Sequence, residues 1–246
     1  MRSLVAAIAL VILSGCSEGQ PTALAPAGAA PIRVLMVTAT AGFRHDSIPA
    51  ARETMATLGS ATGEFVVTAT EDLTTLSAPN LGSYDVLFFA LTSGELPLTD
   101  AQKAAITAFI SGGKGFVGIH SASDTLYDWP EYGAIVGAYF KEHPWTRPAT
   151  VIVEDASHPA TAGLESRFNL TEEFYTFRDN PRPRVQVLLR LDAASVEADG
   201  DYPLAWVHAV GSGRAYYNAL GHFAETWRDQ RFQRQIAGAI RWAAGR

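Results

Sequence analysis

The chain has 246 residues, of which 48% are hydrophobic and 18% charged, a composition typical of a folded globular protein. Its formal net charge of −6 excludes a strongly basic surface, so no nucleic-acid partner is expected. The single cysteine, Cys16, excludes an intramolecular disulfide, so stability has to come from the hydrophobic core. The sequence leaves the oligomeric state open.

The N-terminal segment is predicted to direct the protein to a membrane. Arg2 precedes an apolar run at 4–13, which is too short to span a bilayer and is typical of a secretory signal. The sequence LSGC that ends at Cys16 resembles a bacterial lipobox. Residues 1–15 are therefore predicted to be a lipoprotein signal peptide and Cys16 the lipidated residue. The alternative is an ordinary signal with a chance cysteine. We expect an extracytoplasmic protein, lipid-anchored to a bacterial membrane on its periplasmic face.

Residues 16–31 are rich in Pro, Ala and Gly and show neither helical nor strand periodicity, so they are predicted to be a flexible tether. The folded domain is then 32–246, and it contains no internal repeat.

Strands and helices alternate in the first half of this domain. Apolar runs typical of parallel strands covered on both faces are found at 32–40, 64–70, 84–90 and 115–120. A helix is predicted at 47–59 with Ser47 as its cap, and a second follows a capping box of Thr99 and Gln102 and ends at Gly112. This alternation predicts a doubly wound sheet with the ligand site at the C-terminal ends of its strands.

The second half of the domain is mixed. Strands are predicted at 149–155 and 185–192, and a hairpin at 203–210 and 213–220. An amphipathic helix at 229–245 closes the chain.

Four of the six histidines stand where a strand ends or a loop begins: His45, His120, His143 and His222. His120 occupies the sharp strand-to-helix turn that carries the nucleophile in many α/β enzymes. Because the ends of parallel strands converge, we expect His45, His120 and His222 to line one crevice. Histidine is suited to proton transfer and to metal binding. The alternative for each is a strand-end cap that binds a carbonyl group.

The other two histidines give weaker signals. His158, in SHPATAGL, is predicted to have a structural role in a turn. His208, in AWVHAV, either points into the crevice or only pairs with the adjacent strand, and both alternatives stay open.

An acidic and aromatic segment, NLTEEFYTF, lies at 169–177. In an extended chain Glu172 and Glu173 point to opposite faces, so the two do not form a glycosidase carboxylate pair. Glu173 is expected to enter the site on the same face as Tyr175. An acidic group next to aromatic surface suits sugar binding, or has a raised pKa if it is desolvated. Glu172 is expected at a solvated strand edge.

Several segments, in order along 32–245, resemble the trehalose-utilisation (ThuA-like) family. The segments are GFRHDSI, GKGFVGIHSASDT, YFKEHPW, HPATAGL, TEEFYTF, AWVHAVGSGRAYYNALGHFAETW and AIRWAAG. The resemblance implies a flavodoxin-like fold of the class I glutamine amidotransferase type, a doubly wound α/β sheet with an antiparallel extension. Since His120 stands where amidotransferases carry a cysteine, no glutaminase activity is expected.

The resemblance also implies carbohydrate metabolism, including keto-sugars, and places His45, His143, Glu173, His222 and Trp227 on recurrent motif positions. One hypothesis is therefore an enzyme on a sugar or keto-sugar glycoside, acting as a lyase, hydrolase or isomerase by acid–base chemistry. The expected catalytic residues are His45, His120, Glu173 and His222. The expected substrate-binding residues are His143, Trp145, Tyr175, His208 and Trp227.

Two further hypotheses remain open. A non-catalytic carbohydrate-binding lipoprotein would use Trp145, Tyr175 and Trp227 as sugar platforms. A metal-dependent hydrolase would need ligands from distant loops, because HExxH, HxH and HxxxH spacings are absent from the sequence. No metal ligands are assigned, and a divalent metal is left open.

Overall fold

The computed structural model describes residues 30–246, and Pro31–Arg246 form one compact unit. The predicted signal peptide, Cys16 and nearly all of the predicted tether lie outside the described residues. Within the described part, no helix is both long and apolar enough to cross a membrane.

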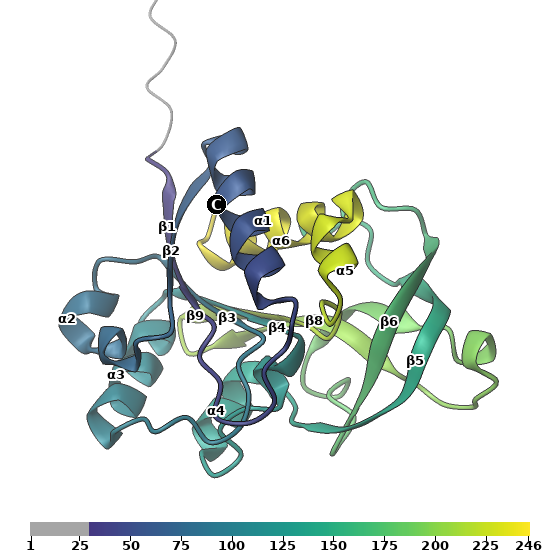
Figure 1. Cartoon of the computed structure of the whole chain (residues 1–246), viewed down its shortest axis with the longest axis horizontal. Coiled ribbons are helices and arrows are strands. Elements are labelled where there is room, and N and C mark those ends of the chain that lie inside the picture. The colour runs from purple at the N-terminus through teal and green to yellow at the C-terminus, as the bar shows by residue number, and fades with distance from the viewer. Residues whose placement is uncertain (1–29) are drawn as a thin grey trace, which may run out of the picture. The chain divides into compact units, whose positions relative to one another are not determined.

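A nine-stranded sheet forms the centre of the domain, in the order β2-β1-β3-β4-β9-β8-β7-β5-β6 (Figure 1). The five strands at one side are parallel: β1 (Ile32–Val37), β2 (Phe65–Thr70), β3 (Val86–Ala90), β4 (Gly115–Ile119) and β9 (Gly213–Asn218). The remaining strands pair antiparallel: β8 (Pro203–Val210), β7 (Gln186–Leu191), β5 (Phe140–Val153) and β6 (Arg167–Phe177). The fold is thus the predicted α/β sheet with an antiparallel extension.

Helices cover both faces of the parallel part, which explains why its inner strands β1, β3 and β4 are almost entirely buried (Figure 1). On one face lie α1 (Ile48–Thr62), α5 (Ala224–Arg228) and α6 (Gln230–Ala243). On the other lie α2 (Ala78–Leu81), α3 (Asp100–Ser111) and α4 (Pro130–Val136). Every residue of β3 and β4 is buried, and these strands form the middle of the hydrophobic core.

The structure confirms most of the predicted elements and corrects three details. The capping box of Thr99 and Gln102 is present, but Ser47 makes no side-chain cap and its hydroxyl instead donates to the carbonyl of Gly221 at 3.4 Å. The strand predicted to begin at residue 149 begins at Phe140, because the polar segment before it pairs with β6. The short helices α2, α4 and α5 were not predicted, since four to seven residues give too little helical periodicity to recognise.

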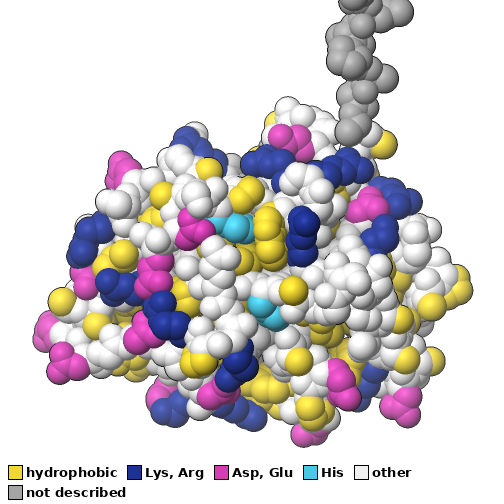
Figure 2. All heavy atoms as spheres, turned by 180° about the vertical axis from the view of Figure 1, so that it is seen from behind, with side chains coloured by type: hydrophobic (Ala, Val, Ile, Leu, Met, Phe, Trp, Pro, Cys, Tyr) yellow, Lys and Arg dark blue, Asp and Glu magenta, His cyan; other side chains and the backbone are white. Residues whose placement is uncertain are grey.

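The face seen from behind carries basic and acidic side chains interspersed with one another (Figure 2). Among the described residues visible from this side, like charges do not gather into one extended patch.

Candidate active site

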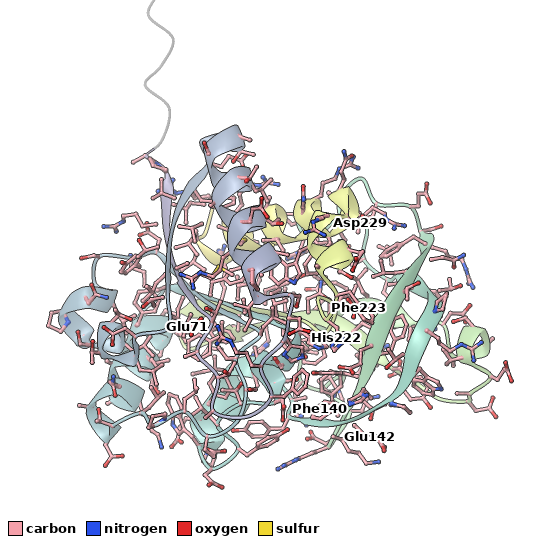
Figure 3. All side chains as sticks on the ribbon, in the orientation of Figure 1. Glu71, Phe140, Glu142, His222, Phe223 and Asp229 are labelled. Carbon is pink, nitrogen blue, oxygen red and sulfur yellow. The ribbon has the colours of Figure 1, made fainter. Side chains whose placement is uncertain are left out.

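The structure brings His45, His120, Glu173 and His222 together at the C-terminal ends of the parallel strands. His45 lies in the loop after β1, His120 directly follows β4, and His222 lies in the segment between β9 and α5. Glu173 reaches them from β6, in the antiparallel extension. One ligand atom from each of the four lies within 4.8 Å of the others. Figure 3 shows His222 at the end of the segment that enters α5, between that helix and the start of β5. We call these four residues the His–Glu cluster.

The loop that carries His45 is attached to the loop after β3. The backbone amides of Ala41 and Gly42 donate to the carbonyl of Ser93 at 2.8 and 3.2 Å, and the Ser93 hydroxyl donates to the carbonyl of Phe43 at 2.6 Å. A Cβ atom at the position of Gly42 would lie 3.3 Å from the backbone nitrogen of Gly94, so this close approach favours glycine. This attachment brings His45 back over the sheet edge.

His120 occupies a strained elbow between β4 and a 3₁₀ turn at His120–Ser123. Its φ of 54° lies in the left-handed region, which residues with a side chain rarely adopt and which is frequent at functional sites. The Tyr217 hydroxyl donates to the His120 carbonyl at 2.7 Å. The imidazole is fully buried, and its Nδ1 donates to the carbonyl of Ala219 at 2.7 Å. The elbow expected from the sequence is therefore present, with imidazole in place of a nucleophile.

The Glu173 carboxylate contacts three imidazoles. Its Oε2 lies 3.4 Å from His120 Nε2 and 3.1 Å from His222 Nδ1, while Oε1 lies 3.2 Å from His143 Nδ1. Burial alone would raise the pKa of Glu173, as the sequence predicted. Hydrogen bonds with His120 and His222 outweigh that effect and hold the pKa well below its ordinary value. The expected raised pKa is therefore wrong, and the group is a carboxylate at neutral pH.

The environments of the histidines differ. Burial lowers the pKa of His45 to about 3, assisted by the neighbouring imidazoles of His120 and His222. Burial also acts to lower the pKa of His222, but its hydrogen bond and charge attraction with Glu173 outweigh burial and raise it. His45 is therefore neutral at physiological pH, whereas His222 carries a proton over a wider range of pH.

Glu172 is not at a solvated strand edge, as the sequence predicted, but fully buried. Its Oε1 accepts hydrogen bonds from the amides of Gly221 and His222 at 2.9 and 3.0 Å and from the Thr226 hydroxyl at 2.7 Å. Its Oε2 accepts from the amide of Glu173 at 2.8 Å. These donors replace the water that a buried carboxylate loses, and they fix the segment that carries His222.

The cluster becomes more exposed toward His143 and a group of phenylalanines. The side-chain exposure is 0% for His120, 11% for Glu173, 21% for His222 and 49% for His143. Aromatic rings stand beside these imidazoles: Phe43 beside His45, Phe140 beside His143 and Phe223 beside His222. Phe140 and Phe223 are labelled on either side of His222 in Figure 3. A ligand would thus approach the cluster past His143 and these three phenylalanines.

The remaining expected substrate-binding residues are placed differently. Tyr175 is buried and lies against His120, with ring centroids 4.2 Å apart. Trp227 is fully buried, and its Nε1 donates to the carbonyl of Gly221, so its indole offers no face to a ligand. Half-buried Trp145 packs edge-on against Tyr202. The structure corrects the expectation of sugar platforms at Tyr175 and Trp227, because both rings are buried. Tyr175 packs against His120, and Trp227 is hydrogen-bonded to the segment that carries His222.

His208 and His158 lie outside the cluster. The Nε2 of His208 binds the carbonyl of Ala134 in α4 at 3.0 Å, on the opposite face of the sheet from α5. Of the two open alternatives, the structure therefore favours a structural one. His158 caps its own turn, because its Nδ1 accepts from the amide of Ala160 at 3.1 Å, in agreement with the structural role that was predicted.

Comparison with known proteins agrees with the fold. The trehalose-utilisation (ThuA) family matches residues 33–243. The chain belongs to the ThuA family. No curated protein matches it. Among solved structures, a ThuA-like protein from Bacteroides uniformis is 25% identical, with a TM-score of 0.74 over 89% of this chain and 94% of that one.

Two more distant structures share the ThuA fold. A ThuA-like protein from Parabacteroides merdae is 19% identical, with a TM-score of 0.72 over 87% of this chain and 90% of that one. A protein described as a GMP synthase subunit from Thermoplasma acidophilum is 12% identical, with a TM-score of 0.55 over 87% of this chain and 95% of that one. These likenesses support the ThuA-like and glutamine amidotransferase-like fold that was predicted. Membership of the ThuA family suggests a carbohydrate-related role.

Sequence reasoning missed several residues of this site. Phe43 and Phe223 stand two residues before His45 and one residue after His222, so aromatic residues close to strand-end histidines were the available signal. The buried role of Glu172 had no such signal, because its donors come from a segment some 50 residues further along the chain. Chemically, the site combines a carboxylate, imidazoles in different electrostatic environments and aromatic rings beside them. This combination suits proton transfer or metal binding.

Proposed function

We propose that the protein is an enzyme that acts on a sugar or keto-sugar glycoside by transferring protons at the His–Glu cluster. The observation that carries the proposal is the Glu173 carboxylate, whose two oxygens contact the buried imidazoles on one side and half-exposed His143 on the other. The carbohydrate-related role of the family supports the choice of substrate class.

A keto-sugar needs only proton transfer to break its glycosidic bond. The ketone acidifies the neighbouring C–H group, so a base removes that proton and the electron pair moves toward the carbonyl oxygen. The electron pair then returns, forms a C=C bond and expels the glycosidic oxygen from the adjacent carbon. That oxygen takes up a proton. The reaction requires a base, an acid and stabilisation of negative charge on oxygen, but no nucleophile.

We assign the proton transfer to His143, oriented by Glu173. Its imidazole is about half exposed and can reach a bound ligand, while its Nδ1 lies 3.2 Å from Glu173 Oε1. A carboxylate that orients an imidazole is the arrangement found in catalytic triads. His120, which the sequence predicted as a proton-transfer residue, is fully buried and in this assignment acts through Glu173 and His222. Phe43, Phe140 and Phe223 would contact the sugar ring.

The test is turnover of a synthetic keto-glycoside by purified variants. His143→Ala and Glu173→Gln are expected to lower turnover by about 10²–10⁴-fold, the usual contribution of one proton-transfer group. Glu142→Gln is the matched control, because Glu142 is an exposed carboxylate on the same strand as His143 that lies outside the cluster. Full activity of both His143→Ala and Glu173→Gln would contradict the proposal. Sugar binding without turnover by the unmutated protein would favour the alternative of a non-catalytic carbohydrate-binding protein.

We propose further that Cys16 carries a lipid that anchors the domain to a bacterial membrane, on its periplasmic face. The support is the sequence LSGC after ten apolar residues. Membrane fractionation of the full-length protein tests this, with Cys16→Ser expected to move the domain to the soluble fraction. An unchanged membrane fraction for Cys16→Ser would contradict lipidation.

A further inference from the structure

Four side chains from four separate segments bring possible metal-binding atoms close together. His45, His120, Glu173 and His222 each contribute one nitrogen or oxygen atom, and these atoms lie within 4.8 Å of one another. Three of the four residues are buried, and His222 is half-buried. Local sequence motifs do not reveal these residues as metal ligands, because no two of them are neighbours in the sequence.

Three of these atoms form a triangle of the size that surrounds a metal ion. His120 Nε2 is 3.2 Å from His222 Nδ1 and 3.4 Å from Glu173 Oε2, and His222 Nδ1 is 3.1 Å from the same oxygen. Zn²⁺ binds such atoms at about 2.0–2.2 Å in a tetrahedron, which places neighbouring ligand atoms about 3.3 Å apart. The three observed separations lie on either side of that value.

The three imidazole rings are also arranged as ligands of one ion. Their centroids are 4.8 Å apart for His45 and His120, 5.1 Å for His45 and His222, and 5.2 Å for His120 and His222. The ring planes cross at 73–85°. Nitrogen atoms at about 2.0–2.1 Å from one tetrahedral ion place the centroids of their rings about 5 Å apart. The rings therefore pack edge to face, at centroid separations that agree with ligands of one ion.

The backbone contact of His120 directs its second ring nitrogen into the cluster. The Ala219 carbonyl only accepts, so His120 Nδ1 donates to it at 2.7 Å. His120 Nε2 then faces Glu173 Oε2 at 3.4 Å and His222 Nδ1 at 3.2 Å. A backbone carbonyl behind a metal-binding histidine is also the usual outer support of such a ligand.

Glu173 is supported in the same way. Its Oε2 faces His120 and His222, whereas its Oε1 contacts His143 Nδ1 at 3.2 Å. Carboxylate ligands of metal ions are commonly held by such an outer contact. The buried carboxylate of Glu172 fixes the backbone of His222, whose amide donates to both of its oxygens.

We infer that His45, His120, Glu173 and His222 bind one divalent transition-metal ion of the class of Zn²⁺ and Co²⁺. Nitrogen from three imidazoles with one carboxylate oxygen is a donor set that suits such ions. The catalytic meaning of the inference rests on the proposed function. The ion would act as a Lewis acid toward an oxygen of the sugar, and His143 would still move the proton.

The test measures metal binding directly, on purified protein from which a chelator has first removed any bound metal. Titration with Zn²⁺ is expected to show one strong site per chain, and Co²⁺ is expected to give the visible absorption of a site with nitrogen and oxygen ligands. His222→Ala and Glu173→Gln are expected to weaken Zn²⁺ binding by more than about 100-fold, above the range for outer contacts. His143→Ala removes only an outer contact, so a loss of about 10-fold is expected.

His208→Ala is the matched control, since it removes a histidine that lies outside the cluster. Circular dichroism of each variant confirms that the folded protein is being titrated. The inference is overturned if the folded wild type binds no Zn²⁺ stoichiometrically, or if His222→Ala and Glu173→Gln bind as tightly as His208→Ala.

These experiments distinguish a failure of the metal-binding inference from a failure of the proposed function. Turnover of a keto-glycoside by a protein that binds no metal would overturn the metal centre and leave the proton-transfer function standing. Stoichiometric metal binding without turnover of any keto-glycoside would support the metal centre, and the proposed function would fall.

Discussion

Replacing Glu172 by glutamine changes one atom of a buried carboxylate on which the geometry of His222 depends. The amide oxygen of the new side chain can take the place of Oε1 and keep the donors from Gly221, His222 and Thr226. The amide nitrogen then takes the place of Oε2 and faces the backbone N–H of Glu173, which Oε2 accepts at 2.8 Å in the native protein. The substitution thus places two donors against each other in the core.

The cost follows from these contacts. A hydrogen bond to a charged group contributes about 1.5–3 kcal/mol, and a buried donor without an acceptor costs about 1–3 kcal/mol. The backbone amide of His222 keeps one acceptor, so the main loss is the hydrogen bond of the Glu173 amide. We therefore expect Glu172→Gln to lower the free energy of unfolding by about 2–4 kcal/mol. For a domain of this size that corresponds to a fall of about 5–15 °C in the melting temperature.

Urea unfolding and thermal melting measure this loss, and turnover measured well below the melting temperature separates it from loss of folded protein. Because Glu172 fixes the backbone at His222, turnover per folded molecule is expected to fall as well. Glu142→Gln, an exposed carboxylate on the neighbouring strand, is the control and is expected to stay within about 0.5 kcal/mol of the wild type. A change of less than about 0.5 kcal/mol for Glu172→Gln would refute the reasoning.

Three further substitutions test other parts of the structure. His120→Ala is expected to lower the free energy of unfolding by about 2–4 kcal/mol, because the ring is fully buried and hydrogen-bonded. His120→Gly is expected to be less destabilising by about 1 kcal/mol, since glycine relieves the strain at φ 54°. A wild-type melting temperature for His120→Ala would contradict this. Asp85→Asn is expected to cost about 1 kcal/mol at pH 7. Hydrogen bonds from Arg33 hold the pKa of Asp85 below its ordinary value, so this contribution is present above about pH 4 and lost as the pH falls through the folded pKa, which urea unfolding at several pH values will show. Phe43→Ala is expected to raise KM for a sugar substrate about tenfold, a loss of about 1.4 kcal/mol, without changing the melting temperature. Val66→Ala, at the other large exposed apolar residue of the described chain, is its control, and equal KM values in the two variants would count against a substrate contact at Phe43.

Periodicity was sufficient to predict the parallel part of the fold. The strands at 32–40, 84–90 and 115–120 were expected to be adjacent and parallel with His120 at a C-terminal end, and the pairings of β1 with β3 and of β3 with β4 confirm this. Such strands are buried on both faces, so their apolar runs are unmistakable. The start of β5 was missed because its residues are mostly exposed and polar, and only pairing with β6 makes them extended.

The site was predictable where it depends on strand ends and not where it depends on side-chain burial. Convergence of parallel strands brought His45, His120 and His222 together as expected. Burial of Trp227 and of Glu172 was not visible, because it is decided by the packing of α5 and its approach segment against β6. Alternation along a strand indicates which residues share a face, but it does not indicate whether that face is covered by another element.

The position of β9 in the sheet has a consequence for how the protein is made. β9 is the last strand of the chain, yet it lies in the middle of the sheet between β4 and β8. While the polypeptide emerges, the edge of β4 stays without its partner until more than 210 residues have been synthesised. An open apolar strand edge is a template for pairing with other chains, so the unfinished protein passes through a long period of exposure to aggregation. Pairing of β9 with β4 covers this edge, and the segment after β9 brings His222 to His120. Both contacts therefore depend on the insertion of β9 into the sheet.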